Sequence, residues 1–368
     1  MKIFKEFLIN NISTFKKILV APLPWGLGHA TRCIPMIDEL IKQNCQVFIA
    51  AEGAAYHLLK KEFPSATFLP LTGYKISYTR QKAFFPVKLL LQFPRIISSI
   101  YKEHQWLKKN IEKYNIDAVI SDNRFGLYSS KIYSIYITHQ LLIKTNNSIT
   151  EKIGQKIHYH FIKKFNECWI PDFEKNGLSG ALSHPKILPA KFNYIGGLSR
   201  FKCKVSEKKY DLLISISGPE PQRTIFEKII LKDLQTYTGK ALFVRGLPGS
   251  IQEINIKNPL ITFKNHLAAN ELNEAMLAAE MIISRCGYTT VMDVVKLKKK
   301  AILVPTPGQT EQEYLAGYLK ERKIFYTTAQ KDFSLQKALY QASTFTYNIP
   351  EYDMEHYKKV VDQFVQSL

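Results

Sequence analysis

The chain has 368 residues, 46% of them hydrophobic and 22% charged, so it is long enough for two domains and too apolar to be disordered as a whole. Its 51 Lys and Arg outnumber 31 Asp and Glu, and the resulting formal net charge of +20 predicts an anionic partner: nucleic acid, a phosphorylated small molecule or an acidic membrane surface. The five cysteines form no CxxC pair, which disfavours zinc and iron–sulfur sites and favours a reduced, cytoplasmic chain. No apolar run reaches the roughly 20 residues that a membrane-spanning helix needs.

The first 16 residues are interpreted as an amphipathic extension. Phe4, Leu8, Ile12 and Phe15 would share one helix face, which either packs on the protein or lies on a bilayer. After this extension, short β-branched runs alternate with longer amphipathic stretches. The predicted strands cover residues 17–23, 46–51, 117–122, 132–138 and 167–172, then 211–217, 240–246, 281–284 and 301–305.

Apolar strands separated by helices indicate a parallel sheet covered on both faces. The sequence therefore predicts an α/β protein of two doubly wound, Rossmann-like domains that face each other across a cleft. The first domain would span residues 17–195 and the second residues 210–345. A polar, glycine-led linker over 196–209 would join them, and residues 346–368 would form a closing helix.

The first predicted strand leads into the loop PLPWGLGHATR, residues 22–32. Gly26 and Gly28 would let the backbone turn sharply and approach a ligand, and the following helix offers free N–H groups to an anion. Thr31 replaces the third glycine of a dinucleotide fingerprint, so a nicotinamide site is not favoured. His29 lies on this turn, where it could exchange a proton near neutral pH or simply cap the helix.

Two further junctions between a strand and a helix carry groups suited to a diphosphate. In SGPEPQR, residues 217–223, prolines fix the turn and Arg223 is placed for a bidentate phosphate contact. In MIISRCGYTTVMDVV, residues 281–295, hydroxyl groups cluster at a helix start, and Asp293 follows about one turn later, where it could accept both hydroxyls of a ribose. Each loop alone could be a capped helix without a ligand, but three together favour a phosphorylated ligand.

The stretch VPTPGQTEQEYLAGYL, residues 304–319, places amides and carboxylates at another helix start. Such groups suit a neutral polyol, because each can bridge adjacent sugar hydroxyls. Glu311 and Glu313 could instead only interact favourably with the helix dipole, and for Glu311 this is the interpretation we expect.

Taken together, WGLGHATR, SGPEPQR, SRCGYTTVMD and PTPGQTEQEYLA resemble the family 28 glycosyltransferases of the GT-B fold. This family includes the N-acetylglucosaminyl transferase that makes lipid II, and the likeness is closer to a branch of predicted bacterial glycosyltransferases. It covers about residues 17–319. The resemblance implies a transferase that moves a hexose or N-acetylhexosamine from a nucleotide sugar, with UDP expected, to a lipid-linked or cell-envelope glycan.

The resemblance also implies which residues hold each substrate. Gly26, Gly28 and Arg32 would face the acceptor beside His29. The donor-binding positions would be Ser217, Gly218, Arg223, His266, Ser284, Arg285, Gly287, Thr289, Thr290, Asp293, Gln312 and Glu313. The pair that contacts the donor sugar is commonly two glutamines in the family and here is Gln312 and Glu313, which leaves the sugar open.

An inverting transfer needs a base for the acceptor hydroxyl and positive groups for the departing diphosphate. Backbone N–H groups and Arg223 could hold that diphosphate without a metal, and no DxD run is present, so we expect no metal and no cofactor besides the nucleotide-sugar co-substrate. His29, Asp122 and His139 all follow predicted strands and are candidate bases. Asp122 could instead orient a histidine or the acceptor, and His139 could be a core histidine.

Residues 79–109 interleave aromatic, aliphatic and basic side chains, with no acid before Glu103. They are interpreted either as an amphipathic helix on the sheet or as a patch that binds anionic lipid at the inner face of the plasma membrane. Two rival functions are a UDP-sugar epimerase of the same fold and a basic nucleic-acid-binding protein. A nucleic-acid partner is not expected, because the positive charge is spread along the chain and no binding module is recognised.

Overall fold

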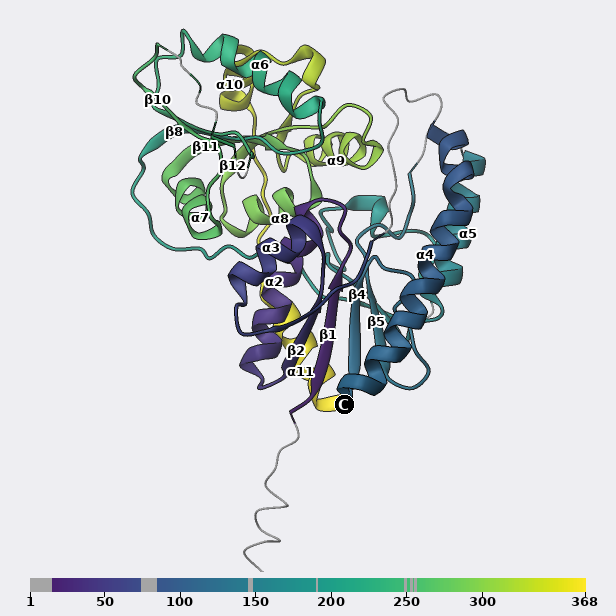
Figure 1. Ribbon diagram of the computed structural model, residues 1–368. Coiled ribbons are helices and arrows are strands. Elements are labelled where there is room, and N and C mark those ends of the chain that lie inside the picture. The colour runs from purple at the N-terminus through teal and green to yellow at the C-terminus, as the bar shows by residue number, and fades with distance from the viewer. Residues whose placement is uncertain are drawn as a thin grey trace, which may run out of the picture.

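The computed structural model describes residues 15–73, 85–144, 148–189, 191–247, 250–251, 254 and 257–368. The helix face predicted from Phe4, Leu8 and Ile12 lies outside the described residues, as does the beginning of the basic stretch up to residue 84. The rest forms two α/β lobes, one above the other in Figure 1.

The first lobe is built on a parallel sheet of seven strands in the order β3-β2-β1-β4-β5-β6-β7. In chain order these strands are β1 (Lys17–Pro22), β2 (Gln46–Ala50), β3 (Thr67–Leu69), β4 (Ala118–Asp122), β5 (Tyr133–Ile137), β6 (Glu167–Ile170) and β7 (Phe192–Tyr194). The helices of this lobe are α2 (Leu27–Lys42), α3 (Gly53–Glu62), α4 (Phe85–Tyr114) and α5 (Ser148–Ile162), followed by a 3-10 turn, η2 (Gly180–Leu182).

The second lobe contains a parallel sheet of six strands in the order β10-β9-β8-β11-β12-β13. The strands are β8 (Tyr210–Ser215), β9 (Ala241–Val244), β10 (Ile261–Lys264), β11 (Ala279–Arg285), β12 (Lys300–Val304) and β13 (Tyr326–Thr327). The helices are α6 (Gln222–Leu234), α7 (Ala269–Ala278), α8 (Tyr288–Lys296), α9 (Thr310–Glu321) and α10 (Leu335–Thr344), with a 3-10 turn, η3 (Gln330–Asp332). The last helix, α11 (His356–Ser367), packs on the first lobe. These two doubly wound parallel sheets confirm the predicted fold class.

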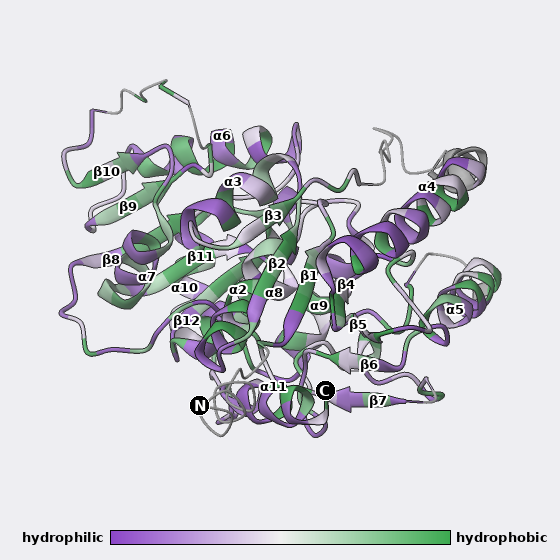
Figure 2. Ribbon diagram, turned by 60° about the horizontal axis from the view of Figure 1, so that its bottom comes forward, coloured by the Kyte–Doolittle hydropathy of each residue, from purple (hydrophilic) through white to green (hydrophobic). Residues whose placement is uncertain are grey.

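Each sheet is buried on both faces because its strands are apolar throughout. In β1, Ile18 and Val20 pack under α2 and α11, whereas Leu19 and Ala21 face the opposite side under α4. In the second sheet, α7, α8 and α9 cover one face and α6 and α10 the other. Figure 2 shows the hydrophobic strands enclosed by helices whose outer faces are hydrophilic. Full burial of one Leu or Ile side chain contributes roughly 1.5–3 kcal/mol to the free energy of unfolding, so the many buried strand residues stabilise both lobes.

The chain crosses between the lobes twice. Residues 196–209 form an irregular connection, and the chain then returns to the first lobe through α11, which packs against α2 with Tyr357, Val361 and Phe364. In Figure 1, α11 is the yellow helix at the end of the chain, in the first lobe. The final helix thus belongs to the core of the first domain.

The strand orders fix where a ligand site is expected. The chain adds strands to one side of β1 first and then, from β4 onward, to its other side. The second domain does the same on either side of β8, with the change at β11. At such a switch point the loops at the carboxyl ends of the two strands diverge and leave a crevice. The glycine loop of residues 22–28 and Asp122 lie at the first switch point, and Ser217, Gly218 and Gly287 lie at the second.

The basic stretch of residues 79–109 is helical from Phe85, as one of its two interpretations requires. Leu107 and Ile111 of α4 pack on the sheet, and Glu103 forms a buried ion pair with Arg124. Ile97 and Tyr101 remain exposed. No helix in the described part of the chain combines the length and apolarity that crossing a bilayer requires.

Candidate active site

Three polar side chains meet at the switch point of the first sheet. Asp122, at the end of β4, accepts hydrogen bonds from both Nε (2.8 Å) and Nη2 of Arg32, and its Oδ1 lies 3.1 Å from Nδ1 of His29. Arg32 and His29 are one helical turn apart on α2, so both point from the same helix face toward β4. The sequence placed these residues at strand ends, and the structure brings them into contact.

The charges in this cluster are well defined. Burial disfavours the charge of Asp122, but Arg32 and then His29 hold the pKa of its carboxyl far below the usual range. Burial, reinforced by Arg32, lowers the pKa of His29 below 6.5, although Asp122 acts against this. At neutral pH the cluster therefore contains an ionised carboxylate, a guanidinium and a neutral imidazole.

Nδ1 of His29 lies 2.8 Å from Nη2 of Arg32 and 3.1 Å from Oδ1 of Asp122, so it can accept from the first or donate to the second. In the amide orientation that pairs both ends of Asn123, the Asn123 oxygen also accepts from Nη2 of Arg32, at 3.2 Å. In the tautomer in which Nδ1–H of His29 donates to Asp122, Nε2 carries the lone pair. No hydrogen bond in the described part of the chain uses Nε2 of His29, whose side chain is 16% exposed, whereas the side chain of Asp122 is fully buried. His29 is thus the one of the two candidates that a second molecule could reach.

His139, the third candidate, connects the two domains. Its Nδ1 accepts from Nη1 of Arg32 (2.8 Å), and its Nε2 lies 2.8 Å from Oε1 of Glu311 on α9 of the second domain. The ring stacks on Tyr288 at 3.9 Å between centroids. Glu311 also accepts from the amide of Gln140 at 3.1 Å. The expectation that Glu311 acts only through the helix dipole is wrong, because its carboxylate pairs with a side chain of the other domain.

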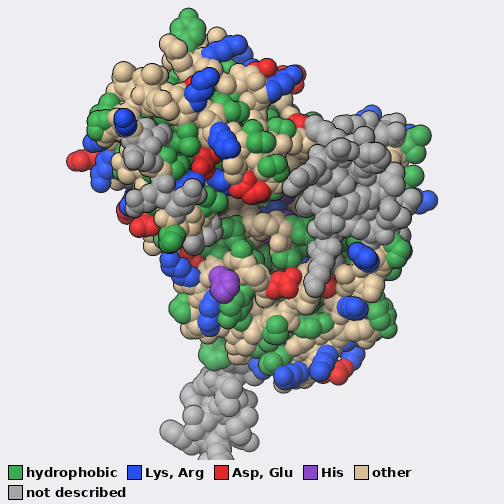
Figure 3. Space-filling model, turned by 45° about the horizontal axis from the view of Figure 1, so that its top comes forward, with side chains coloured by type: hydrophobic (Ala, Val, Ile, Leu, Met, Phe, Trp, Pro, Cys, Tyr) green, Lys and Arg blue, Asp and Glu red, His purple; other side chains and the backbone are tan. Residues whose placement is uncertain are grey.

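The glycine loop of the first domain touches the start of α8 in the second. Gly26 precedes α2 with φ +78°, and a Cβ on Gly28 would lie 3.1 Å from Oγ1 of Thr289. Thr289 also lies 3.4 Å from the carbonyl oxygen of Gly28. Neither α2 nor α8 has a side chain capping its first turn, so N–H groups at both helix starts are without a side-chain partner. Figure 3 shows a hollow between the two lobes with acidic side chains near both rims.

The second domain presents its predicted donor residues around its own switch point. Ser217 and Gly218 are exposed in the loop between β8 and α6, and Gly218 has φ +110°. Gly287 and Thr290 are half-buried at the start of α8. Ser284 is not available there, because its buried hydroxyl donates to the carbonyl of Ser215 inside the sheet (2.9 Å).

Two predicted arginines differ in how they are paired. Arg285 is buried over the ring of Phe226, and its Nη2 donates to the Gln222 carbonyl (2.8 Å), whereas its Nε has no hydrogen-bond partner among the described residues. Burial lowers the pKa of Arg285 to about 10, so the group stays charged at neutral pH.

Arg223 instead forms an ion pair with Glu220 (2.6 Å), a second with Glu227, and a hydrogen bond to Thr224. The predicted diphosphate contact of Arg223 would require these partners to be exchanged.

Asp293 lies on α8, and its buried carboxyl group is only partly compensated by its neighbours. Its Oδ1 accepts from the hydroxyl of Ser199 at 2.6 Å, and burial raises its pKa to about 7 despite that bond and the nearby Arg200. His266 is exposed after β10, and desolvation together with Lys61 and Arg200 lowers its pKa. These residues line one end of the region between the domains, because Lys61 belongs to α3.

Gln312 and Glu313, which are predicted to contact the donor sugar, instead form hydrogen bonds to the turn before α9. Oε1 of Gln312 accepts from the Thr306 amide at 2.9 Å, and Oε1 of Glu313 accepts from the Gly308 amide at 2.8 Å. Both side chains lie at the start of α9, next to Glu311. The hydroxyl of Thr306 in this turn is buried, and no described residue forms a hydrogen bond with it.

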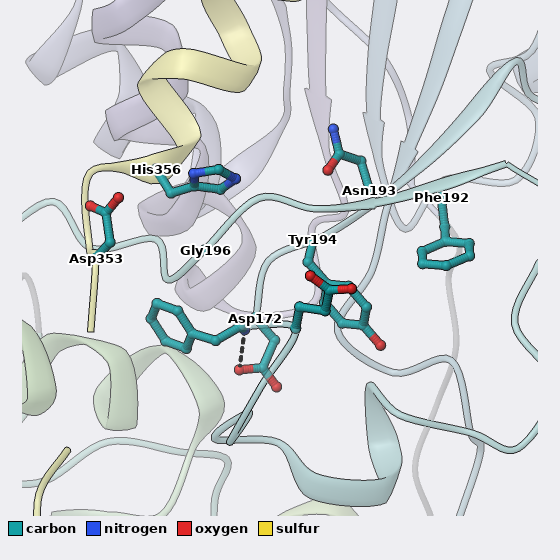
Figure 4. A pocket seen from close by; sticks show the side chains of 9 residues that line it. Asp172, Phe192, Asn193, Tyr194, Gly196, Asp353 and His356 are labelled. Atoms are coloured by element: carbon teal, nitrogen blue, oxygen red, sulfur yellow. Dashed lines mark hydrogen bonds between the residues drawn. The ribbon is translucent and has the colours of Figure 1, made fainter. Parts of the chain in front are cut away.

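A cavity of about 310 Å³ lies away from these residues. It is lined by Asp172, Phe173, Glu174, Phe192, Asn193, Tyr194, Gly196, Asp353 and His356, where the two crossings between the domains pass each other (Figure 4). The carboxylate of Asp172 already accepts from three backbone amides and from the Ser183 hydroxyl. Asp172 therefore orders a loop, and the cavity shares no residue with the charged cluster.

Comparison with known proteins decides the class to which this arrangement belongs. Residues 252–363 match the glycosyltransferase family 28 C-terminal domain. The chain is 23% identical to an uncharacterized glycosyltransferase of Methanosarcina acetivorans, over 85% of this chain and 86% of that one. The chain is a GT-B glycosyltransferase.

Other relatives agree with this assignment. The UDP-N-acetylglucosamine--N-acetylmuramyl-(pentapeptide) pyrophosphoryl-undecaprenol N-acetylglucosamine transferase of Rickettsia akari is 22% identical, with 88% of each chain covered. Among solved structures, the kitacinnamycin glycosyltransferase superposes with a TM-score of 0.66 over 96% of both chains at 11% identity. MurG of Acinetobacter baumannii gives 0.55 over 96% of this chain and all of its own at 13% identity. These structures share the fold of this GT-B glycosyltransferase.

Several residues at the contact between the two domains were not predicted from the sequence. Gln140, Tyr288 and Thr310 were not singled out, and Glu311 was given a minor role. Gln140 and Tyr288 directly follow His139 and Gly287, two predicted site residues, so proximity to a strand end was the available signal. Their contacts depend on how the two domains face each other, which no local pattern contains.

Proposed function

We propose that this glycosyltransferase moves a hexose or N-acetylhexosamine from a UDP-sugar to a lipid-linked or cell-envelope glycan, with inversion and without a metal ion. The observation that carries the proposal is the neutral, accessible His29, held by the Asp122–Arg32 pair directly opposite the start of α8 in the donor domain. The names of the Rickettsia and related enzymes, which contain UDP-N-acetylglucosamine and pyrophosphoryl-undecaprenol, support the choice of donor and acceptor classes.

In this proposal His29 is the general base. The acceptor oxygen attacks the anomeric carbon of the sugar while the bond between that carbon and the diphosphate oxygen breaks. The acceptor proton passes to Nε2 of His29, and the electron pair of the broken bond leaves with UDP. Asp122 orients the imidazole through Nδ1 and stabilises the imidazolium that forms, while its low pKa and full burial make it a poor base.

Positive charge for the departing diphosphate would come from the second domain. The free N–H groups at the start of α8, with the hydroxyls of Thr289 and Thr290, are suited to phosphate oxygens, and Ser217 and Gly218 flank them across the switch point. The cation of Arg285 lies beneath this loop. Asp293 is placed to accept hydrogen bonds from a ribose, and Gln312 and Glu313 to contact the sugar once they release the turn.

The acceptor side suggests how a lipid-linked substrate is reached. On α5, Ile153 and Ile157 are 56% and 37% exposed one turn apart, and Lys152 and Lys156 beside them are also exposed. In Figure 1, α5 lies beside α4, and Phe161 of α5 packs on Ile100 of α4. Exposed apolar and basic side chains on one surface favour binding to anionic lipid. We therefore propose that this α5 surface docks on the acidic face of a membrane.

Vesicle flotation tests the membrane docking. The protein should float with phosphatidylglycerol vesicles and not with phosphatidylcholine vesicles at low salt. Replacing Ile153 and Ile157 together by Ser should reduce flotation at least several-fold. Tyr340→Ser, which removes an exposed aromatic ring from α10 in the other domain, should leave flotation unchanged. Equal flotation with both lipids, or an equal loss in both variants, would refute a specific role for α5.

Nucleotide-sugar screening tests the transferase proposal itself. A ligand that binds the native state raises the melting temperature, so UDP and its correct sugar should each give a shift that ADP-sugars do not. Incubation of that UDP-sugar with lipid extract should then release UDP and label the lipid. Interconversion of the sugar without UDP release would instead indicate an epimerase, and binding of DNA without a nucleotide-sugar shift would indicate a nucleic-acid-binding protein.

A further inference from the structure

One face of α9 connects the donor domain to the first domain along its whole length. In this seam, four residues of α9 and Arg322, which directly follows the helix, make hydrogen bonds to the first domain. These are Thr310 to the Lys144 carbonyl (3.0 Å), Glu311 to His139 and Gln140, Tyr314 to the Ala181 amide (2.7 Å), Tyr318 to the Gly177 carbonyl (2.8 Å) and Arg322 to Asn176 (2.9 Å). Four of them contact Lys144, Asn176, Gly177 or Ala181, whereas Glu311 reaches the cluster that contains His29.

The contact of Glu311 fixes the hydrogens of the cluster. Arg32 can only donate, so Nδ1 of His139 must be the unprotonated nitrogen that accepts from it. Neutral His139 therefore carries its proton on Nε2, which donates to Glu311. Because both nitrogens of His139 are occupied, it cannot serve as the base. Instead it transmits the position of Glu311 to Arg32, and Arg32 in turn holds Asp122 against His29.

Glu311 also sets the charge of the cluster. Burial raises the pKa of Glu311, but His139, Arg32 and His29 together bring it below its ordinary value, so the group is ionised. With Arg32 positive and with Asp122 and Glu311 negative, the cluster has one excess negative charge while both histidines are neutral. That charge is cancelled when His29 takes up a proton. Without Glu311 the same proton uptake would leave a net positive charge in a buried site, which is unfavourable.

The position of Glu311 on α9 adds a link to the donor. Gln312 and Glu313, the two residues expected at the donor sugar, follow it directly in the first turn of the same helix. We propose that Glu311 is a positioning residue of the donor domain. It aligns the His29 base of the acceptor domain and supplies the negative charge that favours proton uptake by His29. The base is therefore fully positioned only when α9 packs against the first domain. This inference rests on the proposed function of His29.

Kinetics of matched variants test the proposal. Glu311→Ala should lower kcat at least tenfold while the donor KM stays within twofold, because the donor contacts are untouched. Glu311→Gln keeps the reach and the hydrogen bond from His139 but loses the charge, so its kcat should lie between those of the wild type and Glu311→Ala. Tyr318→Phe removes another hydrogen bond of the same seam, to Gly177, and should change neither parameter more than twofold.

A purely structural role would affect Tyr318→Phe and Glu311→Ala alike, and that result would overturn the proposal. A donor KM that rises as much as kcat falls in Glu311→Ala would overturn it as well.

Nitrogen-15 spectra of the histidines separate this proposal from the proposed function, since they need no turnover. Wild-type His139 should show its proton on Nε2, and Glu311→Ala should lose that single tautomer. An unchanged tautomer in Glu311→Ala refutes the positioning role even if transfer is observed. Failure of the wild type to transfer any UDP-sugar refutes the function of His29, whatever the tautomer.

Discussion

Replacement of Asp293 by Asn should stabilise the protein, and more so at higher pH. Asp293 is buried with one hydrogen bond from Ser199, and burial raises its pKa from an ordinary 3.8 to about 7. The folded state therefore prefers the protonated acid. This preference contributes its full share of the free energy of unfolding below about pH 4. That share falls as pH rises from about 4 and is lost above about pH 7. Above pH 7 the folded protein must bury a carboxylate that the unfolded chain leaves in water.

The magnitude follows from the pKa difference. At about 1.4 kcal/mol for each pKa unit, a pKa of about 7 in place of 3.8 corresponds to ~4 kcal/mol at pH 8. Asn is a neutral isostere and can still accept from Ser199, so Asp293→Asn should match the wild type only below about pH 4. It should exceed the wild type by about 2 kcal/mol at pH 5 and by ~4 kcal/mol at pH 8. With roughly 2–4 °C per kcal/mol for a domain of this size, the melting temperature at pH 8 should rise by roughly 8–16 °C.

The assay is thermal unfolding of the unliganded protein at pH 5, 6, 7 and 8. Asp332→Asn makes the same substitution at an exposed position of η3 and should show no such pH dependence. The reasoning is refuted if Asp293→Asn is less stable than the wild type at pH 8, or if their difference is the same at every pH.

Two further substitutions test the packing around the site. Gly180 has φ +52°, and a Cβ there would lie 2.6 Å from the Tyr314 hydroxyl, so Gly180→Ala should destabilise the seam by about 1–3 kcal/mol, measured as a lower urea midpoint. Glu103→Gln breaks the buried ion pair with Arg124 and should cost about 3–5 kcal/mol in the same assay. Glu112→Gln, which removes an exposed ion pair with Lys131 from the same helix, should leave that midpoint unchanged; equal effects of the two substitutions would contradict the assigned burial.

The fold was largely predictable because the sheets are apolar on both faces. Nine predicted strands are present, and each of their ends differs from the prediction by at most two residues. The four strands missed are β3, β7, β10 and β13, which are two to four residues long. Each contains too few residues to show a period, and its pairing is determined by the neighbouring strand.

The site was predictable up to the boundary between the domains. His29, Asp122 and Gly287 were found because ligand groups gather at the carboxyl ends of parallel strands, which the strand pattern locates. The partners of Arg223 and Glu311 were not found, for different reasons. Arg223 is paired within its own helix with Glu227, four residues away, a spacing that competes with any ligand. Glu311 meets His139, 172 residues away, only because the two domains pack as they do.

The most direct test of the proposed mechanism is the rate of sugar transfer by His29→Ala at saturating donor, measured together with the donor dissociation constant by calorimetry. The proposal predicts a rate 10²- to 10⁴-fold lower than wild type, roughly the contribution of a general base, with the donor dissociation constant unchanged within twofold. A rate within tenfold of the wild type, or a loss of donor affinity as large as the loss of rate, would contradict His29 as the base.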